Sequence, residues 1–455
     1  MSENLRMITE SLEAGRKASE EHSVRDFILQ EIHAFKQDEE AAPVEGEQVV
    51  LEALRDFYSF HERNSLVCGE NLDYLRWLRR SGYDGKIQCI YIDPPFFSKS
   101  KYDATITLRD GGGKLHKVKH LAYDDTFENS LPRYMAELSA RLVLMKELLA
   151  EDGLIFVHLD WHSSHYVKIL MDEIFGYQHF VNEIIWSYKS GGSGQKHFAR
   201  KHDSILLYSK SDKYKFRIPQ EKSYNRDFKP YHFRGVEEFH DEKGWYTLVN
   251  MKDVWNIDMV GRTSKERTGY ATQKPLELMR RILEAATEEG DLVADFFCGS
   301  GSFLAAAEEA GRRWIGCDSE ILALGLAKSR LSVAGARYEF LAEDGAEMYR
   351  FGGQIRRLLE EALESGYRLV TCALESFVPE IDLGHVPFKD RELIERMTEE
   401  HPLGFVDYVM IDPDYDGTFK AEITRREDFE AMKYIERGRS AYIIVDVFGK
   451  EYRIG

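Results

Sequence analysis

Residues 294–302 read Ala-Asp-Phe-Phe-Cys-Gly-Ser-Gly-Ser, and this stretch decides the fold of the chain. Leu292–Phe297 predicts a strand, the two glycines predict a turn, and Phe303–Ala310 predicts a helix. Such a turn lets a ligand approach the backbone, and the helix N-terminus favours a carboxylate or phosphate. The next strand, Trp314–Cys317, ends about 20 residues on at Asp318, where an acidic residue commonly accepts hydrogen bonds from ribose hydroxyls. We therefore predict a nucleoside cofactor. The missing third glycine of the dinucleotide fingerprint argues against NAD.

Segments on both sides of this stretch alternate between short apolar runs and helical periodicity. This alternation predicts an α/β fold, a doubly wound and mostly parallel sheet covered by helices. The other predicted strands are Ser65–Cys68, Ile87–Ile92, Leu154–Leu159, Ile184–Tyr188 and Ser204–Tyr208. The other predicted helices are Asn71–Arg80, Leu131–Leu149, Tyr166–Ile174 and Leu276–Ala286. Phe97–Leu121 is polar, contains three consecutive glycines, and is predicted to be a mobile loop.

The chain of 455 residues is long enough for two or three domains. Residues 1–62 predict a charged N-terminal helical segment with a break near Pro43, and the two halves of the α/β core occupy 63–188 and 272–345. The alternation is lost in residues 189–271, where basic and aromatic residues mix with turns, so this part is predicted to be an insertion. Residues 346–455 predict a small α+β or β-rich domain. Its predicted elements are a helix at Gly353–Ser365 and strands at Tyr408–Ile411 and Tyr442–Val447.

Charge is distributed unevenly along the chain. The net charge is −18, but between Trp186 and Pro275 there are 18 Lys and Arg against 11 Asp and Glu, a local charge of +7. A basic segment in an acidic protein is a plausible footprint for a polyanion, although a solvated loop region with a chance excess would read the same way. The five cysteines form no CxxC pair and predict reduced core residues of a cytoplasmic protein. No signal peptide or membrane span is predicted.

Residues 91–96 read Tyr-Ile-Asp-Pro-Pro-Phe and form the second informative motif. The two prolines fix φ and remove two backbone donors, so nearby carbonyl oxygens are left to accept from a ligand. Asp93 adds acceptors, and Phe96 adds a flat face for stacking. The hexapeptide therefore suits a planar group with an exocyclic amine. An ordinary turn at the end of a strand is the alternative, because Asp and Pro are common turn residues.

The two motifs together resemble the amino-DNA methyltransferases of the β class, whose core halves are circularly permuted. In that family a DPPY-type motif precedes the FxGxG cofactor motif, as Asp93–Phe96 precedes Phe297–Gly301 here. The departures are Phe96 for the commoner Tyr, Phe296 for a usual Pro and Glu70 for a usual Asp. Three further stretches agree with the family in the same order: Ser65–Leu72, Gly153–Asp160 with Asp172–Gly176 after it, and Thr272–Leu276.

The resemblance implies an adenine-specific enzyme that uses S-adenosyl-L-methionine to methylate double-stranded DNA, similar to the modification subunits of restriction-modification systems. Residues 63–188 would be the catalytic half of the core, 272–345 the cofactor-binding half, and 189–271 the target-recognition region. The implied catalytic residues are Asp93, Pro94, Pro95 and Phe96. The implied cofactor-binding residues are Glu70, Asn71, Lys274, Asp295, Phe297, Gly299, Ser300, Gly301, Ser302 and Asp318. Candidate phosphate contacts are Lys189, Lys196, Arg200, Lys201, Arg262, Lys265 and Arg267.

Several alternatives stay open from the sequence. Asp at position 93 favours adenine over N4 of cytosine by family habit rather than by physics. Two other functions are possible from the sequence. One is a non-catalytic DNA-specificity subunit of a restriction complex, and the other is an enzyme that methylates RNA or a protein amide. A partner subunit of a defence system and a homodimer are equally open. No metal is predicted, since Asp412–Gly417 mimics the start of a calcium loop but has Ile423 at position 12, and an acidic turn between strands is expected there.

Overall fold

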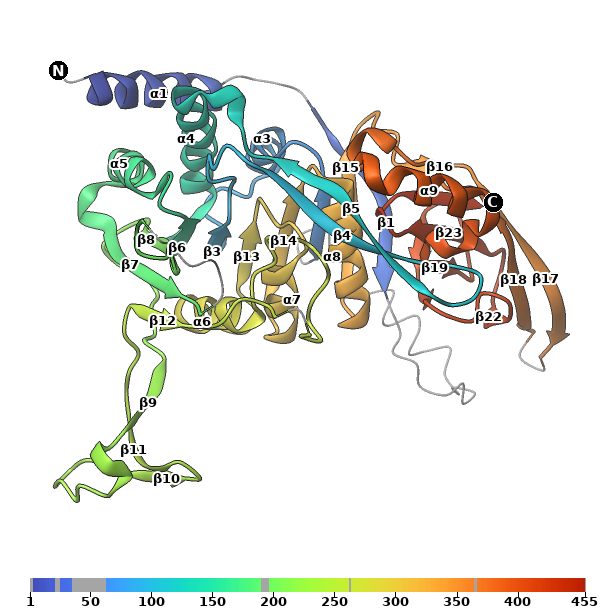
Figure 1. The fold of residues 1–455 in the computed structure, drawn as a ribbon. Helices are drawn as coiled ribbons and strands as arrows, with labels where there is room; N and C mark the ends of the chain where they lie inside the picture. The colour runs from blue at the N-terminus through green and yellow to red at the C-terminus, as the bar shows by residue number, and fades with distance from the viewer. Residues whose placement is uncertain are drawn as a thin grey trace.

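The computed structural model describes residues 3–20, 25–34, 63–189, 196–261, 263–363 and 366–454. In this part of the chain, the centre of the molecule is an eleven-stranded sheet (Figure 1). From one edge to the other its strands are β12 (Val254–Asn256), β7 (Phe180–Ser187), β8 (His202–Ser209), β6 (Leu149–Leu159), β3 (Ile87–Ile92), β13 (Leu292–Asp295), β14 (Arg313–Asp318), β2 (Asn64–Cys68), β15 (Arg337–Glu343), β1 (Phe27–Ala34) and β20 (Phe419–Ala421).

The six central strands, from β6 to β15, are parallel to their neighbours, while β8 and β1 pair antiparallel with the edges of this group. Helices cover both faces, so each face has its own apolar core. One layer contains α1 (Glu3–Glu20), α3 (Asn71–Arg80), α4 (Leu131–Leu148) and α5 (Ser164–Phe175); the other contains α6 (Leu276–Ala286), α7 (Ser302–Glu309) and α8 (Ile321–Val333). The predicted doubly wound, mostly parallel sheet is confirmed.

The predicted elements of the core are all present, with ends within a few residues of the prediction. β3, α3 and α6 have the predicted bounds. Every residue of β3 is buried, and all but Gln88 are apolar, as is typical of a central parallel strand. The side chain of Glu70 caps α3 by accepting from Leu72 N at 3.3 Å, and so fixes where that helix begins.

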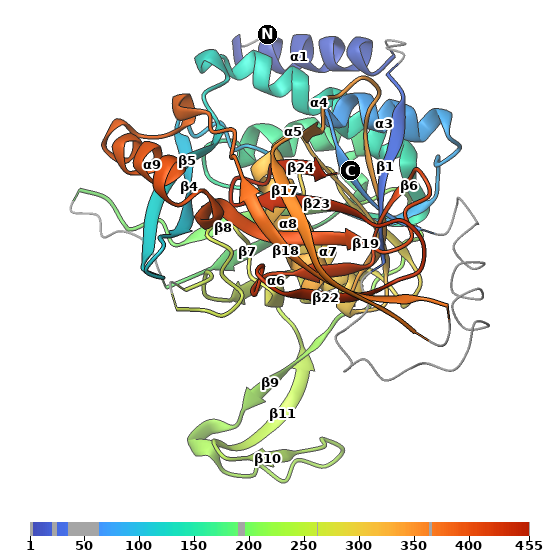
Figure 2. The same ribbon diagram turned by 90° about the vertical axis from the view of Figure 1, so that its right-hand side faces the viewer.

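The segment after β3 forms a hairpin instead of the predicted loop. β4 (Lys101–Arg109) pairs antiparallel with β5 (Leu115–Asp124) across the glycine turn. Ala104, Ile106 and Leu108 are buried at alternate positions and share an apolar cluster with residues of the C-terminal domain. Figure 2 shows this hairpin beside α9 (Phe388–Glu400), where the backbone N–H of Lys119 donates to Asp390 Oδ2 at 3.3 Å. The loop prediction was wrong because the partner that buries this face is distant in the sequence.

The N-terminal segment is helical only in part. α1 agrees with the prediction, but Phe27–Ala34 is the strand β1, which pairs with β15 and β20. The rest of the predicted helical segment, including the break near Pro43, lies outside the described residues. A helical prediction fails at β1 because pairing with a distant strand overrides the local preference.

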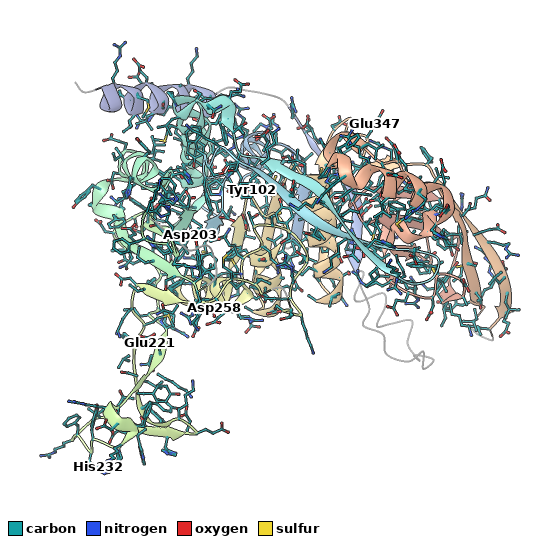
Figure 3. The ribbon with its side chains drawn as sticks, in the orientation of Figure 1. Tyr102, Asp203, Glu221, His232, Asp258 and Glu347 are labelled. Atoms are coloured by element: carbon teal, nitrogen blue, oxygen red, sulfur yellow. The ribbon has the colours of Figure 1, made fainter. Side chains whose placement is uncertain are left out.

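The insertion contains a small sheet that leaves the body of the molecule. β10 (Phe239–Asp241), β11 (Gly244–Asn250) and β9 (Gln220–Tyr224) form a three-stranded arm below α6 and β12 (Figure 1). Figure 3 labels Glu221 on the near part of the arm and His232 at its far end. β8 and β12 belong to the central sheet although both fall within residues 189–271, so the part that leaves the sheet is shorter than that range.

The C-terminal residues form a β-rich domain, as expected. One sheet has the order β16 (Tyr349–Arg350), β24 (Glu451–Ile454), β23 (Ala441–Asp446), β19 (Val406–Asp412) and β21 (Ile423–Arg425); the other has β17 (Gly353–Ala362), β18 (Arg368–Phe377) and β22 (Met432–Glu436). The predicted helix at Gly353–Ser365 was wrong: β17 is a strand paired with β18 along its whole length. Short 3₁₀ helices occur at Phe127–Asn129, Tyr177–His179, Arg226–Phe228, Leu383–His385 and Pro402–Phe405.

Asp412 lies at the expected acidic turn between strands β19 and β20. Its Oδ1 accepts from Asp414 N at 3.0 Å and its Oδ2 from Lys420 N at 2.8 Å, so the carboxylate holds the turn. Within the described residues, no helix combines the length and the apolar character needed to cross a membrane.

Candidate active site

The two sequence motifs meet at the carboxyl ends of neighbouring parallel strands. β13 pairs directly with β3, with Ala294 opposite Ile90, so the turns that follow Ile92 and Asp295 lie side by side. This is the edge of a doubly wound sheet where ligands bind. A cavity of about 460 Å³ opens there, a size typical of cofactor sites. Of the predicted catalytic and cofactor residues, only Gly301 is absent from its lining.

Two carboxylates fix the backbone of the glycine turn by accepting hydrogen bonds from its N–H groups. Asp295 Oδ1 accepts from the backbone N–H of Phe297 at 3.0 Å, and Asp318 Oδ2 accepts from that of Gly299 at 2.8 Å. Burial raises the pKa of both carboxyls. Gly299 and Gly301 have φ of 49° and 73°, the left-handed region that favours glycine. A Cβ on Gly301 would also lie 3.0 Å from the Cβ of Ala327.

Asn71 fixes the backbone of this turn rather than facing the cavity with free groups. Its Nδ2 donates to the carbonyl of Phe296 at 2.8 Å, and its Oδ1 accepts from Arg141 Nε at 2.5 Å. Arg141 Nη2 also donates to Glu70 at 2.5 Å, so one guanidinium from α4 orients both predicted residues. The sequence reasoning missed Arg141, which lines the cavity but lies inside a helix with no motif around it.

A second arginine stands behind the start of α7. Arg330 Nη1 donates to Ser302 Oγ at 2.7 Å, while its Nη2 is buried without a hydrogen-bond partner in the described structure. Burial lowers the pKa of this guanidinium to about 10, so it remains a cation at neutral pH. Together with the helix N-terminus, it makes this end of the cavity favourable for an anionic group.

Asp93 is paired with a lysine from the opposite half of the core. Lys274 Nζ donates to Asp93 Oδ2 and lies 5.6 Å from the centre of the Phe96 ring. Lys274, which the sequence predicts to bind the cofactor, lines the cavity, and in this structure its ammonium contacts the predicted catalytic turn. Asp93 Oδ1 is buried and has no hydrogen-bond partner among the described residues. One oxygen of the carboxylate is therefore available to accept from a ligand.

His158 contacts two residues of the predicted catalytic turn, Phe96 and Asp93. Its fully buried ring stacks on Phe96, with centroids 5.9 Å apart, and its Nδ1 lies 2.9 Å from Tyr91 Oη and 3.9 Å from Asp93 Oδ1. On the other side, Nε2 lies 3.3 Å from Asp203 Oδ2, and this contact lowers the pKa of Asp203 against the effect of burial. Figure 3 labels Asp203 in the body of the molecule. The sequence placed His158 inside a family-like stretch but gave no sign of this role.

The candidate DNA contacts form two groups along the chain. Lys189, Lys196, Arg200 and Lys201 lie between β7 and β8, where Lys189 is 92% exposed and the Arg200 guanidinium stacks 3.9 Å from the Trp161 ring. Lys265 and Arg267 are exposed on the segment that leads to Tyr270 and Lys274, which both line the cavity. Arg262 lies outside the described residues.

The region that contains both motifs of the cavity matches a known protein family. A family model described as "DNA methylase" (N6_N4_Mtase) matches residues 87–329, which is more than half of the chain. The chain belongs to this DNA methylase family. The match includes both motifs of the cavity and the insertion between them.

Several curated relatives are similar to this DNA methylase. The type II methyltransferase M.EcaI of Enterobacter cloacae is 29% identical over 337 residues, covering 60% of this chain and 70% of the relative. The type II methyltransferase M2.DpnII of Streptococcus pneumoniae is 28% identical, covering 58% and 88%. The probable type III Mod subunit HindVI of Haemophilus influenzae is 33% identical over 212 residues, covering 45% and 25%.

Two solved structures are also similar. The cytosine-N4-specific PvuII DNA methyltransferase has a TM-score of 0.40 and 15% identity, covering 60% of this chain and 90% of its own. A putative DNA modification methylase of Thermus thermophilus, in complex with S-adenosyl-L-methionine, has a TM-score of 0.39 and 18% identity, covering 62% and 99%.

Proposed function

We propose that this DNA methylase transfers a methyl group from S-adenosyl-L-methionine to the exocyclic N6 amine of an adenine flipped out of double-stranded DNA. The observation that carries the proposal is the shared cavity. The Asp93–Phe96 turn, with its free carboxylate oxygen, faces the glycine turn of residues 297–301. The catalytic motif precedes the cofactor motif in the chain, which is the order of the β class, and we assign the protein to that class.

The residues present fit this cofactor. We propose that the N-terminus of α7, with Ser302 and the buried Arg330 cation, receives the methionine carboxylate, and that Asp318 accepts from the ribose hydroxyls. Ser300, Phe297 and Asp295 shape the turn, while Glu70 and Asn71, both held by Arg141, line the end that we assign to the adenine. When bound, the cofactor's sulfonium group supplies an electrophilic methyl.

The chain itself prepares the amine. The lone pair of the exocyclic nitrogen is delocalised into the base. When the protein accepts hydrogen bonds from both N–H groups of this amine, a pyramidal and more nucleophilic nitrogen is favoured. Asp93 Oδ1 is free to accept one N–H while Lys274 remains on Oδ2 and holds the carboxylate in place. The carbonyl of Pro94 takes the other, Pro95 fixes the turn, and Phe96 stacks on the base with His158 behind it. This step is positioning and electrostatics, with no covalent nucleophile.

The insertion supplies the DNA contacts in this proposal. Lys189, Lys196, Arg200, Lys201, Lys265 and Arg267 would bind phosphates beside the cavity, with Arg262 in the same stretch of sequence. The arm of β9, β10 and β11 extends this surface away from the body (Figure 1). We propose residues 189–271 as the target-recognition region, 63–188 and 272–345 as the two core halves, and the flanking segments as accessory. A restriction-modification system is the proposed setting, given the relatives.

Sequencing of modified bases in DNA from a host that expresses the protein tests this function. We expect N6-methyladenine at one sequence with the wild type and none with Asp93→Ala. N4-methylcytosine at that site would show that the target base is cytosine and not adenine. No Asp93-dependent methylation, together with no binding of S-adenosylmethionine in calorimetry, would instead support the non-catalytic specificity subunit.

Gly301→Val is predicted to weaken binding of S-adenosylmethionine at least ~10-fold, because a left-handed β-branched residue costs of order 1–3 kcal/mol and its Cβ would meet Ala327. Isothermal titration measures the affinity. Gly290→Val, also left-handed but with open space around its Cβ, is the matched control for backbone strain and should bind the cofactor normally. Wild-type affinity in Gly301→Val would contradict the assignment of this turn.

A further inference from the structure

Phe198 is an aromatic side chain that makes almost no contact with the protein. It is 99% exposed on the segment between β7 and β8, and Lys196, Arg200 and Lys201 lie within three residues of it. Single exposed apolar residues are ordinary on protein surfaces. The position of Phe198 therefore matters more than its exposure.

Phe198 is close in the sequence to Asp203, which is connected to the catalytic motif by two contacts. Five residues after Phe198, Asp203 contacts His158, whose ring stacks on Phe96. An extended chain of five residues spans at most ~18 Å, so the Cα atoms of Phe198 and Asp203 lie within that distance of each other. Arg200, two residues after Phe198, stacks on Trp161. Trp161 follows the carboxyl end of β6, the strand that contains His158. The Arg200–Trp161 contact anchors this segment next to β6, the strand that contains His158.

Cations on both sides of an unburied aromatic ring suit a particular partner. Lys196, Arg200 and Lys201 match the phosphates of a polyanion, and an apolar ring without protein contacts can insert between bases. An enzyme that flips its target base leaves a gap in the duplex, and the unstacking costs free energy. A side chain that fills this gap offsets part of that cost.

We propose that Phe198 enters the DNA duplex at the position that the target base leaves, and that it stabilises the flipped state. The inference rests on the proposed function, because it requires a base in double-stranded DNA as the substrate. In this role Phe198 acts on flipping and does not touch the reacting atoms. Its removal should therefore be harmless when the target base is already unpaired.

The test compares two duplexes that carry the methylated site found by base sequencing. In one the target is paired, and in the other it faces a mismatched base. We expect Phe198→Ala to lower kcat/KM at least ~10-fold on the paired duplex and to recover to within about 3-fold of the wild type on the mismatched one, because a mismatched base flips at lower cost. 2-Aminopurine at the target position should show less fluorescence with the variant than with the wild type.

Two variants serve as controls. Phe198→Leu keeps an apolar wedge and should retain most of the activity on the paired duplex. Phe351→Ala removes an aromatic ring that is 89% exposed in the C-terminal region, far along the chain from the catalytic motif, and should behave as the wild type. Calorimetry with S-adenosylmethionine should give wild-type affinity for Phe198→Ala and so show that the variant is folded.

Equal activity of Phe198→Ala and the wild type on the paired duplex would overturn the inference. Equal loss on both duplexes would also overturn it, since it would place Phe198 against the flipped base or in the fold rather than in the gap. Failure of the proposed function looks different: the wild type itself would then methylate neither duplex.

Discussion

Asp93→Ala is expected to lower the rate of methyl transfer at least ~100-fold, by analogy with the loss of one preorganised polar group at other active sites. Asp93 Oδ2 accepts a hydrogen bond from Lys274 Nζ. Asp93 Oδ1 is buried and has no hydrogen-bond partner among the described residues. Single-turnover transfer of a labelled methyl group to the target duplex measures the effect. Binding of S-adenosylmethionine should persist, because Asp93 is not among the groups assigned to the cofactor.

Matched variants separate the charge of Asp93 from its shape. Asp93→Asn keeps an acceptor oxygen but removes the charge that holds Lys274, so its activity should lie between those of the wild type and Asp93→Ala. Asp124→Asn changes another carboxylate of the cavity lining, one that accepts from Thr126 N at 3.0 Å, and should have little effect. Asp93→Ala with more than about a tenth of wild-type activity would contradict the role of this residue.

Lys328→Met is expected to destabilise the protein by about 3–5 kcal/mol, the usual cost of leaving buried charges unpaired. Lys328 on α8 is 2% exposed and donates to Glu31 Oε2 at 2.9 Å and Glu451 Oε1 at 2.5 Å. Tyr349 also donates to Glu31, at 2.9 Å. The cluster joins strands β1 and β24 to the core, so the lysine holds together three parts of the chain. Urea unfolding at neutral pH measures the loss.

The control for this prediction removes the charges together. Lys328→Met combined with Glu31→Gln and Glu451→Gln leaves no uncompensated ion and should regain much of the lost stability. Lys189→Met, at a side chain that is 92% exposed, should change stability by less than about 0.5 kcal/mol. A Lys328→Met variant as stable as the wild type would show that the two carboxylates do not depend on this cation.

Local sequence was a sufficient guide where local rules govern the structure. The buried run of β3, the capped start of α3 and the amphipathic α6 could be placed because periodicity and caps act over a few residues. β1 and the β4–β5 hairpin could not, because β1 pairs with the distant strand β15 and the hairpin is buried against the C-terminal domain. β17 could not, because its strand conformation depends on pairing with β18 while most of its side chains stay exposed. A propensity that is weak locally is overridden by such pairing.

The site divides in the same way. The motifs gave Asp93, Phe96, Gly299 and Asp318, since each lies where a strand ends and a turn begins. They did not give Arg141 or Arg330, because a lone arginine inside a helix carries no signature in the sequence.

The sequence by itself determined the alternating α/β core and the two strand-end turns, because both depend on short-range patterns of apolar residues, prolines and glycines. Only the tertiary structure decided that Ala294 lies opposite Ile90 and so brings residues about 200 positions apart into one cavity. It also decided that Lys274 pairs with Asp93 and that His158 stacks behind Phe96. Pairing between strands and burial of charges depend on the whole fold, and no local pattern specifies them.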